Sequence, residues 1–92
     1  MDLSLIPRFE RPRTRAGQPI IGKARALWDF EAESEVEVGM RKGDVLNVIE
    51  KVDFTWWFCE NASLAEREPG AAKIQGSVPV EYTEDLDFFI GC

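Results

Sequence analysis

The apolar residues of this chain occur in short runs that alternate with polar residues, and turn-forming residues separate the runs. The run VLNVIEK, residues 45–51, places Leu46 and Val48 on one face of an extended segment, because neighbouring residues of a strand point to opposite faces. The runs KARALWDF, WWFCEN and KIQGSV have the same strand-like length and composition. We therefore expect a chain built mainly from short β-strands.

Turn signals lie between these runs. The letters KGD at residues 42–44 predict a tight turn, and residues 52–55 are a short enough link for a hairpin. Gly76 is a candidate for a bulge or a close backbone approach, and Pro79 ends its strand. Residues 80–86, VEYTEDL, predict a tight helical turn followed by a last short strand.

Residues 62–72, ASLAEREPGAA, combine small and charged residues with a Pro-Gly pair. They could hold a helical turn, but the composition favours a long loop. The whole pattern shows five short strands and no amphipathic helix. It predicts an all-β fold, a small five-stranded barrel of two packed orthogonal sheets with a short 3-10 turn.

The two ends of the chain differ from this β-rich part. Residues 1–22 carry three prolines and four arginines, so we expect a flexible basic arm or linker. Residues 23–87 are expected to form one domain. Residues 88–92, FFIGC, are expected to be an apolar tail that packs on the arm or on parts of a longer protein.

Charge is distributed unevenly along the chain. Residues 1–25 hold six Lys/Arg and two acids, whereas residues 26–92 hold five Lys/Arg and fifteen acids. A body this acidic repels phosphate backbones, so we expect no nucleic-acid partner. The longest apolar runs are only a few residues long, so we expect no membrane insertion either.

The chain contains no histidine, and Cys59 and Cys92 are its only cysteines. Zinc-ligand clusters and Cys/His or Ser/His catalytic pairs cannot be assembled from these residues, so we expect no metal, no cofactor and no catalytic residue. An enzyme using paired carboxylates is disfavoured because the acids are spread over loops. We expect Cys59 to be a buried thiol, Cys92 to be free, and the compartment to be cytoplasmic, because no disulfide framework is present.

Four motifs give the chain a specific resemblance. ALWDF, KGD, WW and VPVEY occur in this order at residues 26–30, 42–44, 56–57 and 78–82. With these motifs, residues 23–86 resemble an SH3 (Src-homology 3) domain. The resemblance implies a non-catalytic protein-interaction module that binds proline-rich peptides of the PxxP type with flanking Arg or Lys.

The resemblance also implies which residues bind the ligand. The groove for the prolines is assigned to Trp28, Phe30, Trp56, Pro79 and Tyr82. A polyproline II peptide has three residues per turn and no internal hydrogen bonds, so its proline faces fit between aromatic rings. A Trp indole N–H can then donate to a ligand carbonyl.

The RT loop of the family corresponds to residues 31–37, which contain four glutamates. In the family, acids in this loop pair with an Arg or Lys of the ligand, and Glu37 matches the position most often used. The resemblance assigns a specificity pocket to six residues: Glu33, Glu35, Glu37, Phe54, Thr55 and Glu81. It also places the long loop at residues 62–72 at the barrel end away from the groove.

Strand alternation and the family pattern together predict the core. The residues expected to be buried are Ala24, Ala26, Val38, Met40, Leu46, Val48, Cys59 and Val78. Trp57 should share the buried face with Cys59, which leaves Trp56 on the opposite face.

Two departures from the family pattern leave a second interpretation open. Glu81 replaces an Asn that often donates a hydrogen bond to the ligand, and an ionised carboxylate has no proton to donate. Phe54 adds apolar surface at the pocket rim. The alternative is an SH3-like scaffold domain whose atypical or occluded groove packs on a neighbouring domain or subunit. A further alternative is an intramolecular contact between the N-terminal arm and the groove.

Overall fold

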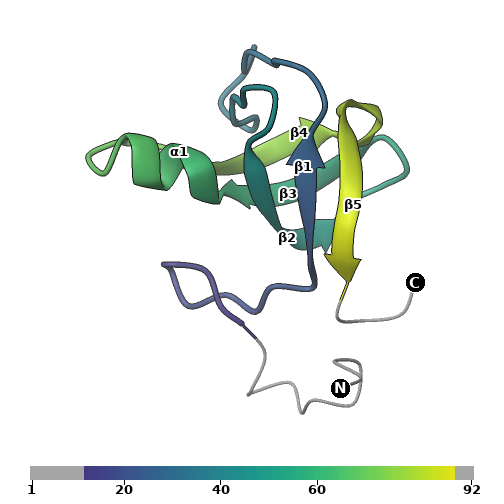
Figure 1. Ribbon diagram of the computed structural model, residues 1–92, viewed down its shortest axis with the longest axis horizontal. Helices are drawn as coiled ribbons and strands as arrows, with labels where there is room; N and C mark the ends of the chain where they lie inside the picture. Colours follow the sequence, from purple (N-terminus) through teal and green to yellow (C-terminus); the bar gives the residue numbers. More distant parts are fainter. Residues whose placement is uncertain (1–11, 89–92) are drawn as a thin grey trace.

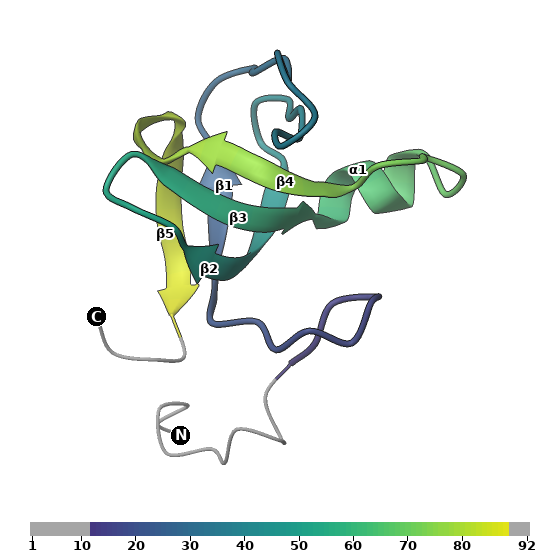
Figure 2. The same cartoon turned by 180° about the vertical axis from the view of Figure 1, so that it is seen from behind.

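The computed structural model describes residues 12–88 and contains five antiparallel strands (Figure 1). These strands are β1 (Gly22–Ala26), β2 (Val45–Lys51), β3 (Trp56–Asn61), β4 (Gln75–Pro79) and β5 (Thr83–Phe88). They pair in the order β4-β3-β2-β1-β5, and β1 and β5 run across β3 and β4, so that the ladder curls into a barrel (Figures 1 and 2). The 3-10 helix η3 (Val80–Tyr82) lies between β4 and β5. The expected five-stranded, all-β barrel with a 3-10 turn is confirmed.

One apolar cluster fills the barrel. Its buried members are Ala24, Ala26, Val38, Met40, Leu46, Val48, Trp57, Cys59 and Val78. All eight residues predicted for the core belong to this cluster. Trp57 is also buried, whereas Trp56 is partly exposed, which confirms the predicted division between the neighbouring indoles.

The segment at residues 62–72 begins with a helix, α1 (Ala62–Arg67), so the prediction of a long loop is wrong for these six residues. Asn61 caps the helix, because its side-chain oxygen accepts a hydrogen bond from the Leu64 N–H at 2.9 Å. Ala65 is buried. The cap and this small buried residue allow one and a half turns of helix before Pro69 and Gly70.

Residues 30–40 form a long hairpin that carries the RT loop. Phe30 and Met40 pair across its base, and Glu37 forms a parallel bridge with Ser77 of β4. A Cβ atom at Gly76 would lie 2.6 Å from the backbone carbon of Glu37. The hairpin can therefore reach β4 only because residue 76 has no side chain, and the predicted close backbone approach is confirmed.

Part of the segment expected to be a flexible arm packs on the outer face of the sheet. The Arg15 N–H donates to the Glu60 carboxylate at 3.0 Å, and the Gln75 side-chain amide donates to the Gln18 side chain at 2.6 Å. Ile20 is only 3% exposed although it lies outside the barrel core. Residues 12–21 thus cover polar groups on β3 and β4. Residues 1–11 lie outside the described residues.

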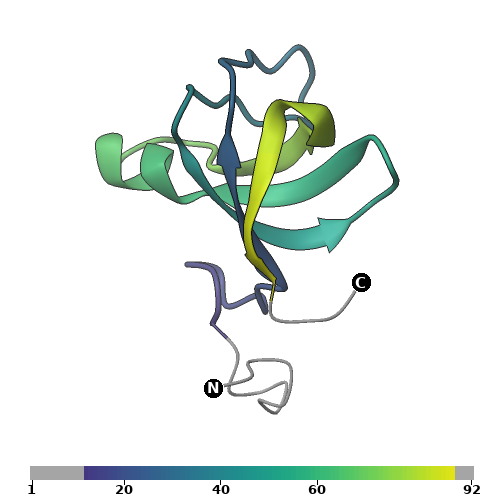
Figure 3. The same cartoon turned by 45° about the vertical axis from the view of Figure 1, so that its right-hand side comes forward.

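Phe88, which we expected in the tail after the last strand, is the final residue of β5. Its ring lies edge-on to the Trp57 ring, with the centroids 5.4 Å apart, and the Lys51 ammonium lies 4.4 Å from the Phe88 ring centroid. Figure 3 shows β5 and β1 side by side at this end of the barrel. The expectations for residues 89–92, including Cys92, fall outside the described residues. Within residues 12–88, no helix has the length and apolar character needed to cross a membrane.

Candidate functional site: an aromatic groove beside an acidic loop

Three aromatic rings meet on one side of the barrel. The Phe30 ring is edge-on to the Trp56 ring, with the centroids 6.2 Å apart, and edge-on to the Tyr82 ring, with the centroids 6.0 Å apart. Trp56 also pairs with Pro79 across β3 and β4. The structure thus brings together four of the five residues assigned to the groove. The fifth, Trp28, is 57% exposed and precedes Phe30 by two residues.

Backbone hydrogen bonds fix the segments that carry these rings. The Leu27 N–H donates to the Tyr82 carbonyl at 2.7 Å, which joins the end of β1 to η3. The Val80 N–H donates to the Thr55 carbonyl at 2.8 Å, which joins η3 to the loop before β3. These bonds therefore join backbone segments that are far apart in the sequence and that carry the rings.

The β2–β3 loop, residues 52–55, borders this aromatic cluster. One carboxylate oxygen of Asp53 accepts hydrogen bonds from the Thr55 N–H at 2.7 Å and the Trp56 N–H at 2.8 Å. This bonding closes the loop as an Asx turn. Phe54 is fully exposed at the tip, and Thr55 is exposed as well. Both residues that were assigned to the specificity pocket from this loop therefore lie at the surface, next to Trp56.

The three glutamates assigned to the pocket lie on the hairpin, on the other side of β4 from β3. Glu33 and Glu35 are exposed, whereas Glu37 is half-buried and accepts a hydrogen bond from the Glu33 N–H at 2.8 Å. Glu37 lies two strand spacings from Phe58, because both residues pair with Ser77 of β4, and Trp56 lies two residues further along β3. Glu81, the remaining pocket residue, is exposed on η3.

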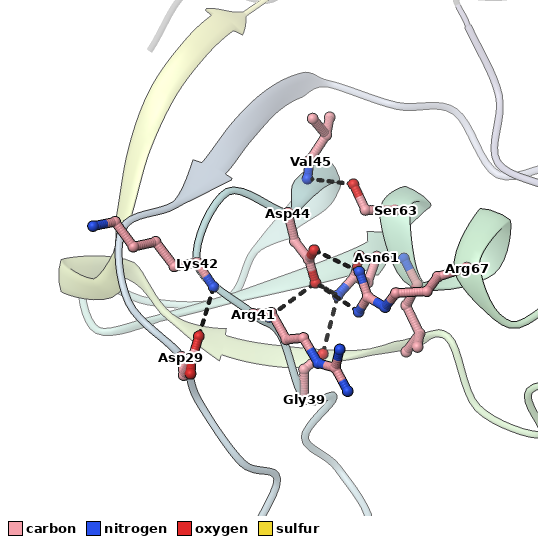
Figure 4. A network of polar contacts seen from close by, with 10 residues as sticks. Asp29, Gly39, Arg41, Lys42, Asp44, Val45, Asn61, Ser63 and Arg67 are labelled. Atoms are coloured by element: carbon pink, nitrogen blue, oxygen red, sulfur yellow. Dashed lines mark hydrogen bonds and ion pairs between the residues drawn. The ribbon is translucent and has the colours of Figure 1, made fainter.

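A buried carboxylate that the sequence reasoning did not single out lies between the hairpin and α1 (Figure 4). Asp44 accepts hydrogen bonds from both terminal nitrogens of the Arg67 guanidinium, at 2.8 and 3.2 Å. The Arg41 N–H and the Asn61 side-chain amide each donate to it at 2.9 Å. Burial by itself raises the pKa of Asp44, but these hydrogen bonds and the charge of Arg67 outweigh burial and leave the pKa below its usual value.

Cys59 is fully buried, and burial raises the pKa of its thiol to about 12, so the thiol is neither accessible nor ionised near neutral pH. Among residues 12–88, no three His, Cys, Asp or Glu side chains gather so as to hold a metal ion. What the surface offers instead is a set of partly exposed aromatic rings beside exposed carboxylates.

Comparison with known proteins assigns the family. The family model described as SH3 domain matches residues 25–67. The chain is also 31% identical to the SH3 domain of yeast NBP2, with a TM-score of 0.56 and with 71% of this chain and 97% of that chain covered. The chain belongs to the SH3 domain family. The fold and the order of the four motifs in this SH3 domain agree with that assignment.

This SH3 domain is also similar to a peptide-bound SH3 structure and to parts of longer proteins. It is 28% identical to the yeast Nbp2p SH3 domain in complex with a peptide from Ste20p, with a TM-score of 0.58 and with 73% of this chain and 88% of that chain covered. It is 36% identical over 72 residues to protein-tyrosine kinase 6 from Mus musculus, covering 72% of this chain. The chain spans 15% of that kinase and between 4% and 14% of three further curated relatives, so each of those proteins is several times longer than the part that this chain matches.

Proposed function

We propose that this SH3 domain is a non-catalytic interaction module that binds a proline-rich peptide carrying an Arg or Lys beside its prolines. The observation that carries the proposal is the cluster of Phe30, Trp56 and Tyr82 rings beside Pro79 on one side of the barrel. The complex of a related SH3 domain with a Ste20p peptide supports it. In this chain the groove residues are Trp28, Phe30, Trp56, Pro79 and Tyr82.

The aromatic cluster suits a polyproline II ligand for physical reasons. Such a ligand has no internal hydrogen bonds and loses little conformational entropy on binding, and its proline rings form apolar ridges. Phe30 packs edge-on against Trp56 and Tyr82, so flat, stiff rings line the surface proposed for these ridges. A small, rigid and shallow interface is expected to give affinities in the micromolar range.

The acids on the hairpin and on η3 supply the second part of the proposal. Glu33, Glu35 and Glu37, with Glu81, Phe54 and Thr55, form the proposed specificity pocket. An exposed ion pair contributes only about 0.2–1 kcal/mol, so these acids set the orientation of the ligand and the association rate more than the affinity. The acidic body also disfavours nucleic acid, and we propose an intracellular, peptide-bearing protein as the partner.

The direct test is an NMR titration of the chain with a proline-rich peptide that carries one Arg. We expect chemical-shift changes at the indole N–H groups of Trp28 and Trp56 and at Tyr82, and no comparable change at buried Trp57. A peptide in which alanines replace the prolines is the matched control. Shifts that are equal for both peptides, or that are confined to residues outside the groove, would contradict the proposal.

A second candidate function is favoured by two specific residues. Glu81 cannot donate the hydrogen bond that an Asn would, and Phe54 is fully exposed beside the groove. In this alternative the domain is a scaffold whose groove packs on a neighbouring domain or subunit, and a library of proline-rich peptides would cause no shifts at Trp56. Residues 12–21 contact β2, β3 and β4 rather than the groove. The alternative of an arm bound in the groove therefore concerns residues 1–11, which lie outside the described residues.

A further inference from the structure

The segment between β3 and β4 contacts the RT loop, although we expected it at the barrel end away from the groove. We call residues 62–73, which comprise α1 and the chain that follows it, the insertion. The Lys73 ammonium donates a hydrogen bond to the backbone carbonyl of Glu35. Ala72 and Lys73 also line a shallow surface cleft of about 620 Å³ together with residues 32–35 and Glu37. The C-terminal end of the insertion therefore lies against the acidic segment of the hairpin.

The N-terminal end of the insertion is fixed at the base of the same hairpin (Figure 4). The Asn61 amide, which caps α1, donates to the Gly39 carbonyl at 3.1 Å and to Asp44 at 2.9 Å. Arg67, in the last turn of α1, makes its two hydrogen bonds to the same carboxylate. Asn61, the residue before the insertion, contacts the base of the hairpin, and Lys73 contacts its tip, so the insertion can hold the tip at a fixed position relative to the barrel.

We propose that the insertion braces the RT loop and that Lys73 is a positioning residue for the acids that bind the basic flank of the ligand. This inference rests on the function proposed above. Glu35 is held through its carbonyl, and the Glu37 carboxylate is already bonded to the Glu33 N–H. Exposed ion pairs are weak partly because flexible groups must be ordered when they form. Ordering this segment in advance therefore preserves more of the ion-pair gain on binding.

Lys73 also has an electrostatic effect that opposes its effect as a brace, so an experiment can distinguish the two. Its positive charge lies beside the acids and weakens their attraction for a basic ligand. If Lys73 acted only as a charge, removing it would increase the preference for a basic peptide. If Lys73 acts as a brace, removing it lowers that preference. The two roles therefore predict changes of opposite sign.

The experiment measures the dissociation constants of two proline-rich peptides that differ only in having Arg or neutral citrulline beside the prolines. The ratio of the citrulline value to the Arg value is the charge preference. In the unmodified chain we expect a preference between about 1.4-fold and fivefold, the range of exposed ion pairs. In Lys73→Met we expect the excess of this ratio over one to fall to about half of its original value or less. Lys73→Arg keeps a long cationic donor and should restore it.

A charge-matched control is Lys42→Met, because Lys42 lies at the base of the hairpin and contacts Asp29 through its backbone N–H rather than its ammonium. Its charge preference should stay unchanged or rise. Amide hydrogen exchange at Glu33 should become faster in Lys73→Met and return to normal in Lys73→Arg.

Two results would overturn the proposal in distinguishable ways. If Lys73→Met leaves the charge preference unchanged or raises it while the unmodified chain binds the Arg peptide, the brace is contradicted and the proposed function stands. If the unmodified chain binds neither peptide, the proposed function fails and the inference fails with it.

Discussion

Asp44 is almost completely buried and is nevertheless held in its charged form by its neighbours. Four hydrogen bonds, from Arg67, Arg41 and Asn61, replace the water that the carboxylate loses on folding. A buried carboxylate is destabilising unless it is paired and hydrogen-bonded. The KGD turn therefore has a second role, because its last residue anchors α1 to the hairpin.

Replacing Asp44 by Asn tests this anchor. The substitution keeps the shape of the side chain but removes the charge that both Arg67 nitrogens contact, and an amide nitrogen facing them would be a donor facing donors. We expect the free energy of unfolding to fall by about 1–3 kcal/mol in urea titrations. Asp29→Asn is the matched control, because Asp29 is exposed and accepts only a hydrogen bond from the Lys42 N–H among its described contacts. An equal loss in both variants would contradict the anchoring role.

The lowered pKa of Asp44 also makes a prediction about pH. A carboxyl whose pKa is lower in the folded state contributes stability that is fully present above its unfolded value, about 3.9. This contribution is lost as the pH falls through the lower folded value. We therefore expect the difference in unfolding free energy between the unmodified chain and Asp44→Asn to be constant near neutral pH and to shrink below about pH 4. A difference that grows on acidification would contradict it.

At the scale of elements, the contact between the hairpin and β4 decides where the acids lie. The Ser77 N–H donates to the Val36 carbonyl at 2.7 Å, and the Val38 N–H donates to the Ser77 carbonyl at 3.2 Å. These bonds run past Gly76, where a Cβ atom would lie 2.6 Å from two backbone atoms of the hairpin. The hairpin, β4 and β3 are thus joined side by side, with the acids on the hairpin at one edge and Trp56 on β3 at the other.

Gly76→Ala should move the hairpin away from β4. The added methyl group meets backbone rather than a flexible side chain, so the hairpin must shift, and we expect a loss of about 1–3 kcal/mol in unfolding free energy. Gly70→Ala is a matched control, because nothing lies within 4 Å of the corresponding Cβ position. Thermal unfolding of the two variants side by side measures the effect. If Gly76→Ala were as stable as Gly70→Ala, the close approach would not constrain the hairpin.

The sequence predicted the strands and the core well because each depends on local alternation and on motifs that are adjacent along the chain. Gly76 and Cys59 could be interpreted from their own strands. The pairing of Asp44 with Arg67 could not, because the two residues are 23 positions apart and no local pattern links them. The helix α1 was missed for a related reason, since its cap, Asn61, was counted only as the end of a strand.

At the scale of the whole molecule, the described part of the N-terminal segment acts as a cover for the sheet. Asn47 and Glu60 lie on neighbouring strands with side chains away from the core, and the Asn47 amide donates to the Glu60 carboxylate at 3.1 Å. The Arg15 N–H of the covering segment donates to the same carboxylate at 3.0 Å, whereas the Asn47 side-chain oxygen has no hydrogen-bond partner among the described residues. Composition alone predicted a linker here, because proline-rich and basic residues do not reveal that the sheet has polar groups to satisfy.

Ile20→Ala tests the cover. Ile20 is the buried apolar residue of this segment, and losing its side chain should lower the unfolding free energy by about 2–5 kcal/mol. The affinity for a proline-rich peptide should not change, because the cover contacts β2, β3 and β4 away from the aromatic cluster. Calorimetry would give both quantities. An unchanged melting temperature would show that residues 12–21 add nothing to the stability of the barrel.

Trp56→Ala is the most direct test of whether the aromatic cluster binds a proline-rich peptide. Trp56 is partly exposed and belongs to the ring cluster rather than to the barrel core, so the variant should keep its fold by circular dichroism and NMR. A buried interface Trp typically contributes about 2 kcal/mol or more, so the dissociation constant for the Arg-containing peptide should rise roughly thirtyfold or beyond measurement. A folded variant that binds the peptide as tightly as the unmodified chain would show that the aromatic cluster is not the peptide site, and a variant that unfolds would make Trp56 a structural residue instead.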